Sequence, residues 1–261
     1  MIETKIILEK KVKLKNPICI VGLPGIGNIG RIAVGYMIQQ LKAKKIAELY
    51  SPYFFPFVMI HESTIHTLRN EFYLYKTKSR DIIFLIGDCQ TYDPKGHYEV
   101  AHKILEFLKS LEVKEIITIG GFGTGKVSEN PEVYGIASDK QVFKKYSKYK
   151  KINFKVEHKI GTIVGASGLL PGLGKQYGIS GLVLLGETSG FPIITDPTAA
   201  EAVLIILNEM LKLKIDLNKL QEKVDAMHNF IKKLEQIQAQ AMAQIEKSKK
   251  GTSKEKLKYI G

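Results

Sequence analysis

Short apolar runs without a charged residue recur along this chain and alternate with longer amphipathic stretches. The clearest are Ile18–Gly22, Ile82–Ile86, Ile116–Ile119 and Leu182–Leu185. Apolar runs of strand length are typical of strands buried on both faces, and helical stretches between them provide the crossovers that parallel strands need. The pattern therefore predicts an α/β fold in which helices cover both faces of a mainly parallel sheet.

The same reading places further elements along the chain. Asp139 is a suitable helix N-cap, and Pro197 suits the first turn of a helix. The other expected extended segments are Ala47–Tyr50, Val58–His61, Phe72–Tyr75, Val133–Ser138 and Thr162–Ala166. The expected helices are Ile29–Leu41, Glu99–Leu111, Asp139–Tyr149 and Pro197–Leu213.

Length and composition indicate one main domain with an appendage. The chain has 261 residues, of which 44% are hydrophobic, enough to bury a full core. We expect an α/β domain over 1–213, a long amphipathic helix over 214–247 and a flexible basic tail over 248–261. Apolar residues from Leu217 onward follow a heptad spacing, which fits either a coiled coil or a helix that lies back on the domain. The lysine-rich tail has too few apolar residues to fold by itself.

The chain is strongly basic. It carries 39 Lys+Arg against 26 Asp+Glu, a formal net charge of +13, which favours acidic partners through long-range attraction. Its arginines are Arg31, Arg69 and Arg80 alone. Base-edge readout and bidentate phosphate contacts draw heavily on arginine, so we expect no specific nucleic-acid binding.

Cysteine content and the amino-terminal sequence indicate a soluble, cytoplasmic protein. Cys19 and Cys89 offer neither a disulfide framework nor metal-ligand spacing, so no metal site is expected. The first residues alternate apolar and charged side chains and lack the apolar region of a signal peptide. No stretch approaches the roughly 18 apolar residues of a membrane span.

A glycine motif follows the first apolar run. Gly25, Gly27 and Gly30 satisfy the spacing G-x-G-x-x-G, with Asn28 between them, and a helix is expected to begin there. Such a turn can expose a helix N-terminus to a phosphate, and Glu48 stands about where a ribose-binding acid would be. This pattern supports one alternative, a nucleotide-dependent enzyme that is a ligase or a phosphorylase-like transferase. The other reading is that the glycines let a strand and a helix pack closely.

A second glycine-rich stretch resembles a phosphate-binding loop but departs from it. Residues 120–126 read GGFGTGK, yet Val127 stands where Ser or Thr would coordinate Mg²⁺. Pro131 also interrupts the helix that such a loop requires. We therefore do not expect a P-loop.

Several residues capable of catalysis were weighed, and none forms a convincing set. His61-Glu62 and His66 miss the zinc-protease spacing by one residue, and both histidines on one strand would point to opposite faces. Ser167 follows an expected strand but lacks an evident base. Three further residues, Asp88, His97 and Glu187, lie at or beyond expected strand ends, where they would bind a ligand or cap helices.

Four motifs, taken in order, resemble the proteasome assembly chaperone family, particularly its archaeal members. They are GLPGIGNIG at 22–30, GGFGTG at 120–125, PEVYGIASD at 131–139, and the block GTIVGASGLLPGLGKQYGISGLVLLGETSGFPIITDPTAA at 161–200. The resemblance covers about Ile18 to Leu213. It implies a three-layer α/β/α sandwich of the phosphorylase/hydrolase-like type, with the C-terminal helical extension attached.

The resemblance also implies a function. Members of this family are ATP-independent chaperones rather than enzymes, so no catalytic residues and no cofactor are expected. They form homo-oligomers, and their C-terminal segments reach toward proteasome α-subunits. The leading hypothesis is therefore a proteasome assembly chaperone or an activator-like protein.

The docking signal of the family is a C-terminal triplet of a hydrophobic residue, tyrosine and any residue, whose terminal carboxylate pairs with a lysine between α-subunits. This chain ends Leu257-Lys258-Tyr259-Ile260-Gly261, with tyrosine third from the end and a lysine before it. In a shifted register, Tyr259 or Ile260 would fill the pocket and Gly261 would supply the carboxylate. The other reading is a solvated lysine tail.

Overall fold

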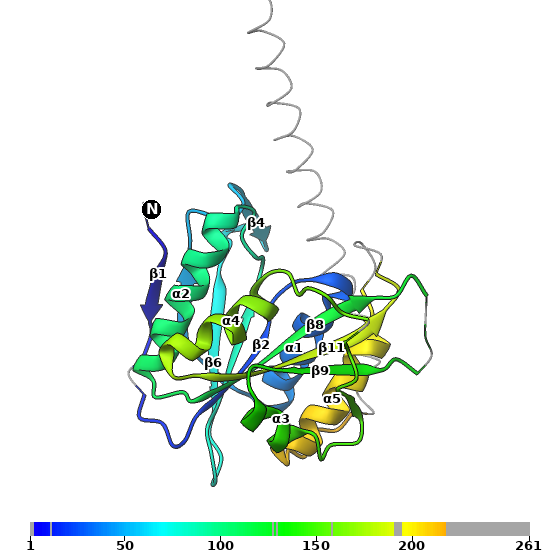
Figure 1. Cartoon of the computed structure of the whole chain (residues 1–261). Coiled ribbons are helices and arrows are strands. Elements are labelled where there is room, and N and C mark those ends of the chain that lie inside the picture. The colour runs from blue at the N-terminus through cyan, green and yellow to red at the C-terminus, as the bar shows by residue number, and fades with distance from the viewer. Residues whose placement is uncertain are drawn as a thin grey trace, which may run out of the picture.

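The structure is a computed structural model, and it describes residues 3–217 apart from 11, 127, 129, 158 and 191–194. Within these ranges, nine strands form one sheet in the order β1-β3-β6-β7-β2-β8-β11-β9-β10, and a separate hairpin joins β4 to β5 (Figure 1). The strands are β1 (Lys5–Leu8), β2 (Ile18–Gly22), β3 (Lys44–Tyr50), β4 (Val58–His61), β5 (Thr64–Thr67), β6 (Asn70–Tyr75), β7 (Ile82–Gly87), β8 (Glu115–Gly123), β9 (Val133–Ala137), β10 (Ile152–Asn153) and β11 (Ser180–Thr188). The α-helices are α1 (Ile29–Leu41), α2 (Pro94–Ser110), α3 (Lys140–Tyr146), α4 (Ala166–Gly174) and α5 (Pro197–Leu211).

The sheet is parallel at its centre and antiparallel toward its margins. The four central strands β7, β2, β8 and β11 run in one direction. On one side β1, β3 and β6 pair antiparallel in turn, and on the other β9 runs against β11. The prediction of a mainly parallel sheet is thus correct for the centre and for the marginal pair β9–β10, while the other marginal pairs are antiparallel. A short connection such as the one from β6 to β7 cannot hold a crossover helix, so these strands pair antiparallel.

Helices cover both faces of the sheet, which confirms the α/β fold and its three layers. Side chains alternate along β2, so Ile18 and Ile20 join one apolar cluster while Cys19 and Val21 join another. The first cluster includes residues of α1, α3 and α5, and the second includes residues of α2 and α4. The all-apolar sequence of β2 follows from this burial on both sides.

Several helix ends follow their expected caps. The Asp139 carboxylate accepts hydrogen bonds from the backbone N–H groups of Gln141 and Val142, both at 2.9 Å. Asp196 caps α5 in the same way through Ala199 N–H, and Pro197 occupies the first turn. These short side chains satisfy N–H groups that have no partner inside the helix.

Several predicted elements differ from the structure, and three of these differences bear on the site or on its helices. The segment Thr162–Ala166 is not a strand: residues 162–165 are irregular and α4 begins at Ala166. Helix α2 begins at Pro94 rather than Glu99, because Asp93 caps it through Gly96 N–H at 2.9 Å. Helix α3 ends at Tyr146, earlier than expected.

Glu115, a buried acid, links several elements at the edge of the sheet where the central strands begin. Glu115 at the start of β8 accepts a hydrogen bond from Tyr146 Oη at 2.6 Å and contacts Lys145 Nζ at 2.7 Å and Arg80 Nη2 at 3.3 Å. Burial alone would raise the pKa of Glu115, but these partners lower it below its usual value. The carboxylate therefore ties the β6–β7 turn to α3.

The carboxyl-terminal parts expected beyond the domain fall almost wholly outside the described residues. Of the helix expected over 214–247, only residues 214–217 are described, and these four residues are not helical; Tyr36 Oη donates there to the carbonyl of Asp216 at 2.5 Å. The tail over 248–261 lies entirely outside. In the described ranges, every helix is too short or too polar to cross a membrane.

Candidate functional site at the carboxyl edge of the sheet

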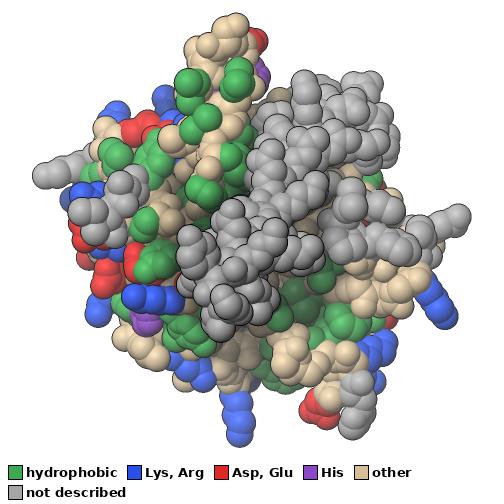
Figure 2. Space-filling model, turned by 90° about the horizontal axis from the view of Figure 1, so that it is seen from above, with side chains coloured by type: hydrophobic (Ala, Val, Ile, Leu, Met, Phe, Trp, Pro, Cys, Tyr) green, Lys and Arg blue, Asp and Glu red, His purple; other side chains and the backbone are tan. Residues whose placement is uncertain are grey.

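A cleft of about 760 Å³ opens where β2, β8 and β11 end. Both glycine motifs line it and lie against each other, with Gly25 and Ile26 from the first and Gly120–Gly123 from the second. The irregular segment before α4 forms a further wall. Figure 2 looks down on this edge and shows hydrophobic side chains across it, with most Lys and Arg side chains around the rim. The position is the usual one for a ligand site in an open α/β sheet.

Backbone packing accounts for the glycines between strand and helix. A Cβ added at Gly22 would lie 2.0 Å from the carbonyl oxygen of Gly30, and one at Gly30 would lie 2.7 Å from that of Ile119. A Cβ at Gly121 would lie 2.2 Å from the carbonyl oxygen of Ile26. Real Cβ atoms do not approach so closely, so glycine is required at these three positions, where α1 and its turn meet β2 and β8.

The turn before α1 is also closed off by the start of α5. Gly27 and Asn28 both have left-handed backbone, with φ of 66° and 49°. The Gly27 carbonyl accepts a hydrogen bond from Asp196 N–H at 2.9 Å, and a Cβ added at Gly27 would lie 3.4 Å from the Cβ of Asp196. The start of α5 therefore packs against the turn, and the Asp196 carboxylate is engaged in capping α5 through Ala199 N–H. Gly25 alone has open space toward the cleft, and a ligand on this loop stays a prediction.

Gln90 is the polar residue that organises the cleft, and sequence analysis missed it. Its Nε2 donates to the carbonyl of Pro24 at 2.6 Å, and its Oε1 accepts from Ala166 N–H at 2.9 Å. Gln90 therefore links the first glycine turn to the start of α4. The only sequence signal is its position just after β7, at the edge where ligands bind.

The cleft residues lack a connected catalytic set in the part of the chain that is described. Ser167 lines the cleft, but no hydrogen bond joins its hydroxyl to a histidine or a carboxylate there. His97 also lines it, and burial lowers the pKa of its imidazole, which favours the neutral ring. Glu187 accepts from the backbone N–H of Glu132 at 3.1 Å and so orders the loop before β9.

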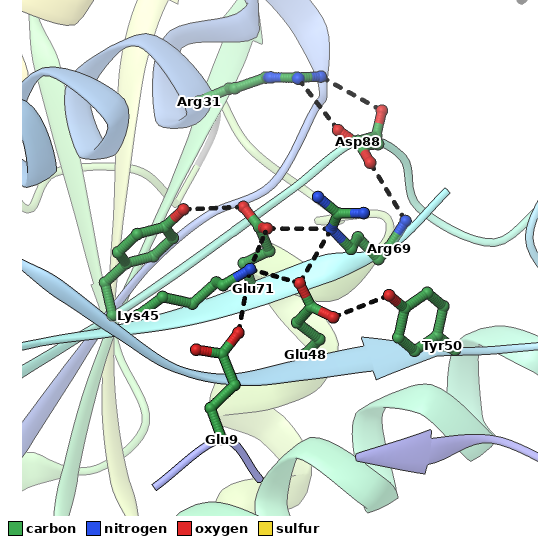
Figure 3. Close-up of polar contacts among 9 residues, drawn as sticks. Glu9, Arg31, Lys45, Glu48, Tyr50, Arg69, Glu71 and Asp88 are labelled. Carbon is green, nitrogen blue, oxygen red and sulfur yellow. Dashed lines mark hydrogen bonds and ion pairs between the residues drawn. The ribbon is translucent and has the colours of Figure 1, made fainter. Parts of the chain in front are cut away.

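Asp88 lies beside the cleft in an ion pair. Arg31 of α1 reaches its carboxylate at 3.5 Å and donates to its carbonyl at 3.2 Å, while Arg69 N–H donates to the carboxylate at 3.1 Å (Figure 3). Burial raises the pKa of Asp88 despite Arg31. The pair joins α1 to the strands β6 and β7.

Glu48 is not beside the glycine turn, which corrects its predicted part in ribose binding. It lies on β3, which β6 and β7 separate from β2, and contacts Lys45 and Arg69 at 2.5 and 3.3 Å (Figure 3). Glu71 joins the cluster through Arg69 at 3.0 Å, and Tyr50 donates to Glu48 at 2.8 Å. Burial alone would raise the pKa of Glu48, but these partners lower it. This charged cluster covers one face of the antiparallel strands.

Two motif readings can be settled from the fold. Residues 120–123 belong to β8 and the next element is the strand β9, so the expectation that 120–126 is not a P-loop is confirmed. His61 and His66 lie on the two strands of the β4–β5 hairpin with ring centroids 6.4 Å apart. The expectation that they share a strand and face apart is therefore wrong, because a turn separates them. Among the described residues no three His, Cys, Asp or Glu side chains are placed to hold a metal.

The tail residues Leu257–Gly261, which the resemblance assigns to partner binding, lie outside the described residues. Their part in recognition stays a prediction.

Comparison with known proteins identifies the family. The chain is 34% identical over 260 residues to the uncharacterised protein MJ1210 of Methanocaldococcus jannaschii, an alignment that covers 98% of both chains. Among solved structures, Pyrococcus furiosus PbaB, described as an archaeal proteasome activator, is 39% identical with a TM-score of 0.81, covering 90% of this chain and 100% of PbaB. Pyrococcus furiosus PbaA, described as an archaeal homolog of proteasome-assembly chaperone, is 29% identical with a TM-score of 0.74, covering 90% of this chain and 98% of PbaA. The profile of the PAC2 family matches residues 19–235. The resemblance found in the motifs is thus confirmed, and the chain belongs to the PAC2 family.

Proposed function

We propose that this protein acts on the proteasome as an assembly chaperone or an activator. The observation that carries the proposal is the likeness to PbaB, an archaeal proteasome activator, over that protein's whole length. PbaA, a homolog of proteasome-assembly chaperone, supports the same class of function.

The cleft chemistry supports a binding protein more than an enzyme. The alternative, a nucleotide-dependent ligase or phosphorylase-like transferase, would hold phosphate on the loop from Gly25 to Gly30. Gly30 is already explained by its contact with Ile119, and Asp196 stands beside Gly27. The Gly27 carbonyl is also bound by Asp196 N–H, so this part of the loop is already held by the start of α5.

The tail is the proposed contact with proteasome α-subunits. Tyr259 or Ile260 fills a pocket between two subunits, and the Gly261 carboxylate pairs with a lysine there. The protein forms a homo-oligomer, so several tails engage one ring, and linked weak contacts add to a much higher avidity. The lysines of the tail speed the encounter with acidic surfaces.

The proposal is tested by α-subunit binding to the full chain and to a variant without 257–261. Loss of pull-down in the truncated variant is expected, and unchanged binding would remove the tail from the mechanism. Tyr259→Ala should weaken binding by about 2 kcal/mol, or roughly 30-fold, if the ring is a buried anchor.

A matched pair of lysine variants separates position from charge. Lys258→Ala and Lys249→Ala each remove one positive charge from the tail. Position-specific docking predicts that Lys258→Ala weakens binding more, whereas equal losses would show that only net charge matters. Calorimetric titration with ATP, NAD and nucleosides tests the enzyme alternative, which micromolar binding would favour.

A further inference from the structure

The two edges of the sheet differ sharply in charge. Four stretches contain no Asp, Glu, Lys or Arg, and each of them reaches the carboxyl edge: 17–30, 51–61, 116–125 and 160–174. The turns at the amino edge, by contrast, are rich in lysine. Those turns and the residues that flank them span 42–45, 76–81 and 109–115. A chain with a net charge of +13 therefore keeps most of its lysines away from the cleft at one edge, where Arg31 pairs with Asp88 and Glu62 stands in the hairpin turn.

Large apolar side chains are exposed on this lysine-poor edge. Ile60 and Ile65 of the β4–β5 hairpin are 77% and 71% exposed, and Val164 at the cleft wall is 85% exposed. Tyr92 packs against Phe55 at the base of the hairpin, with ring centroids 5.6 Å apart, and is itself 54% exposed. Exposed apolar patches of this kind mark protein contacts.

The hairpin is supported by its own subunit on one side only, because Met59 packs against the core while Ile60 and Ile65 are exposed. In the described residues β4 and β5 pair only with each other, and Figure 2 shows the hairpin projecting from the body with hydrophobic side chains along it. An isolated two-stranded hairpin is marginally stable in water. A second surface that covers Ile60 and Ile65 would stabilise it.

We infer that this carboxyl-edge face, made of the β4–β5 hairpin, Tyr92 and the cleft wall at Val164, is the contact between copies of this chain. The inference rests on the homo-oligomer of the proposed function and names its surface. Two copies of a chain with a net charge of +13 repel each other, and lysine-rich turns placed face to face would increase that repulsion. A second copy can approach the lysine-poor edge without that added repulsion, whereas an acidic partner is attracted to the lysine-rich edge.

The test is the mass of the full chain in solution. The double variant Ile60→Lys with Ile65→Lys places like charges at each contact. Because Ile60 and Ile65 pair directly across the hairpin, the single variant Ile60→Lys is measured beside it and should lower the mass in the same way without a like-charge pair inside the hairpin. Ile7→Lys is the matched control, because Ile7 is 53% exposed on the edge strand β1 and lies outside the face. Light scattering after size exclusion should show several chains for the parent and for Ile7→Lys, and one chain for the double variant. Circular dichroism should show the same fold for all of these proteins.

Other outcomes would overturn the inference. If the parent protein has the mass of a single chain, the copies make no such contact. If the double variant has the same mass as the parent, the contact lies elsewhere on the surface. If the double variant keeps its mass but loses α-subunit pull-down, the face takes the proteasome and not a second copy. If the parent protein does not bind α-subunits but its mass still falls in the hairpin variant, the proposed function is rejected and the contact between copies remains.

Discussion

Replacing Gly30 by alanine tests whether the first glycine motif exists for packing. The added Cβ would lie 2.7 Å from the Ile119 carbonyl oxygen, where ordinary contact begins at 3.4 Å, and 3.0 Å from the Gly22 Cα. Both neighbours are backbone atoms that cannot rotate away, so α1 must move from the sheet. Overpacking of this kind costs up to about 3 kcal/mol, and the better helix preference of alanine returns about 1 kcal/mol. Gly30→Ala should therefore destabilise the fold by about 2 kcal/mol.

Gly172 in α4 provides the matched control. It is also a helical glycine, but a Cβ there would meet nothing within 4 Å, so Gly172→Ala should stabilise by up to about 1 kcal/mol. Urea unfolding of the full chain followed by circular dichroism measures both changes. For a domain of this size, a loss of about 2 kcal/mol lowers Tm by roughly 4–8 °C. Equal effects of the two substitutions would refute the packing argument.

Two further predictions concern buried ionisable groups. The pKa of Glu115 in the fold lies below its usual value of 4.5, so its carboxylate stabilises the protein above that pH and the contribution is lost as pH falls through the folded pKa. Glu115→Gln should lower the free energy of unfolding by about 1–3 kcal/mol at pH 7 and by progressively less below pH 4. The control Glu106→Gln, which removes an exposed pair with Lys103, should change it by almost nothing. Denaturant titrations at pH 7 and pH 3 that give equal losses for Glu115→Gln would contradict this. Burial raises the pKa of the Cys89 thiol to about 12 and that of Cys19 further, so both should react with a thiol reagent only after unfolding, and prompt labelling at pH 8 would count against the core assignment.

The sequence predicted the elements whose burial leaves a local pattern. Ile18–Gly22 and Ile29–Leu41 were expected with the bounds that the structure has, since one is apolar throughout and the other follows a glycine turn. Thr162–Ala166 was misread because its uncharged, β-branched residues line a cleft instead of pairing with a strand. Local composition does not distinguish these two causes.

The candidate site was predicted only in part. Both glycine motifs were recognised in the sequence. That they line one cleft could not be predicted, because the two motifs are about a hundred residues apart and a local pattern carries no information on such contacts. The hydrogen bonds of Gln90 and the place of Glu48 on β3 likewise depend on strand order. Strand order follows from tertiary packing and not from spacing along the chain.

The position of β2 has a consequence for synthesis of the chain. Its neighbours β7 and β8 both follow it, and the register between β2 and β8 pairs Ile18 with Glu115. A ribosome that has released residues only as far as β7 therefore presents β2 with one unpaired, wholly apolar edge. Until β8 emerges, the nascent protein carries an aggregation-prone strand, and slow translation between residues 87 and 115 would lengthen that interval.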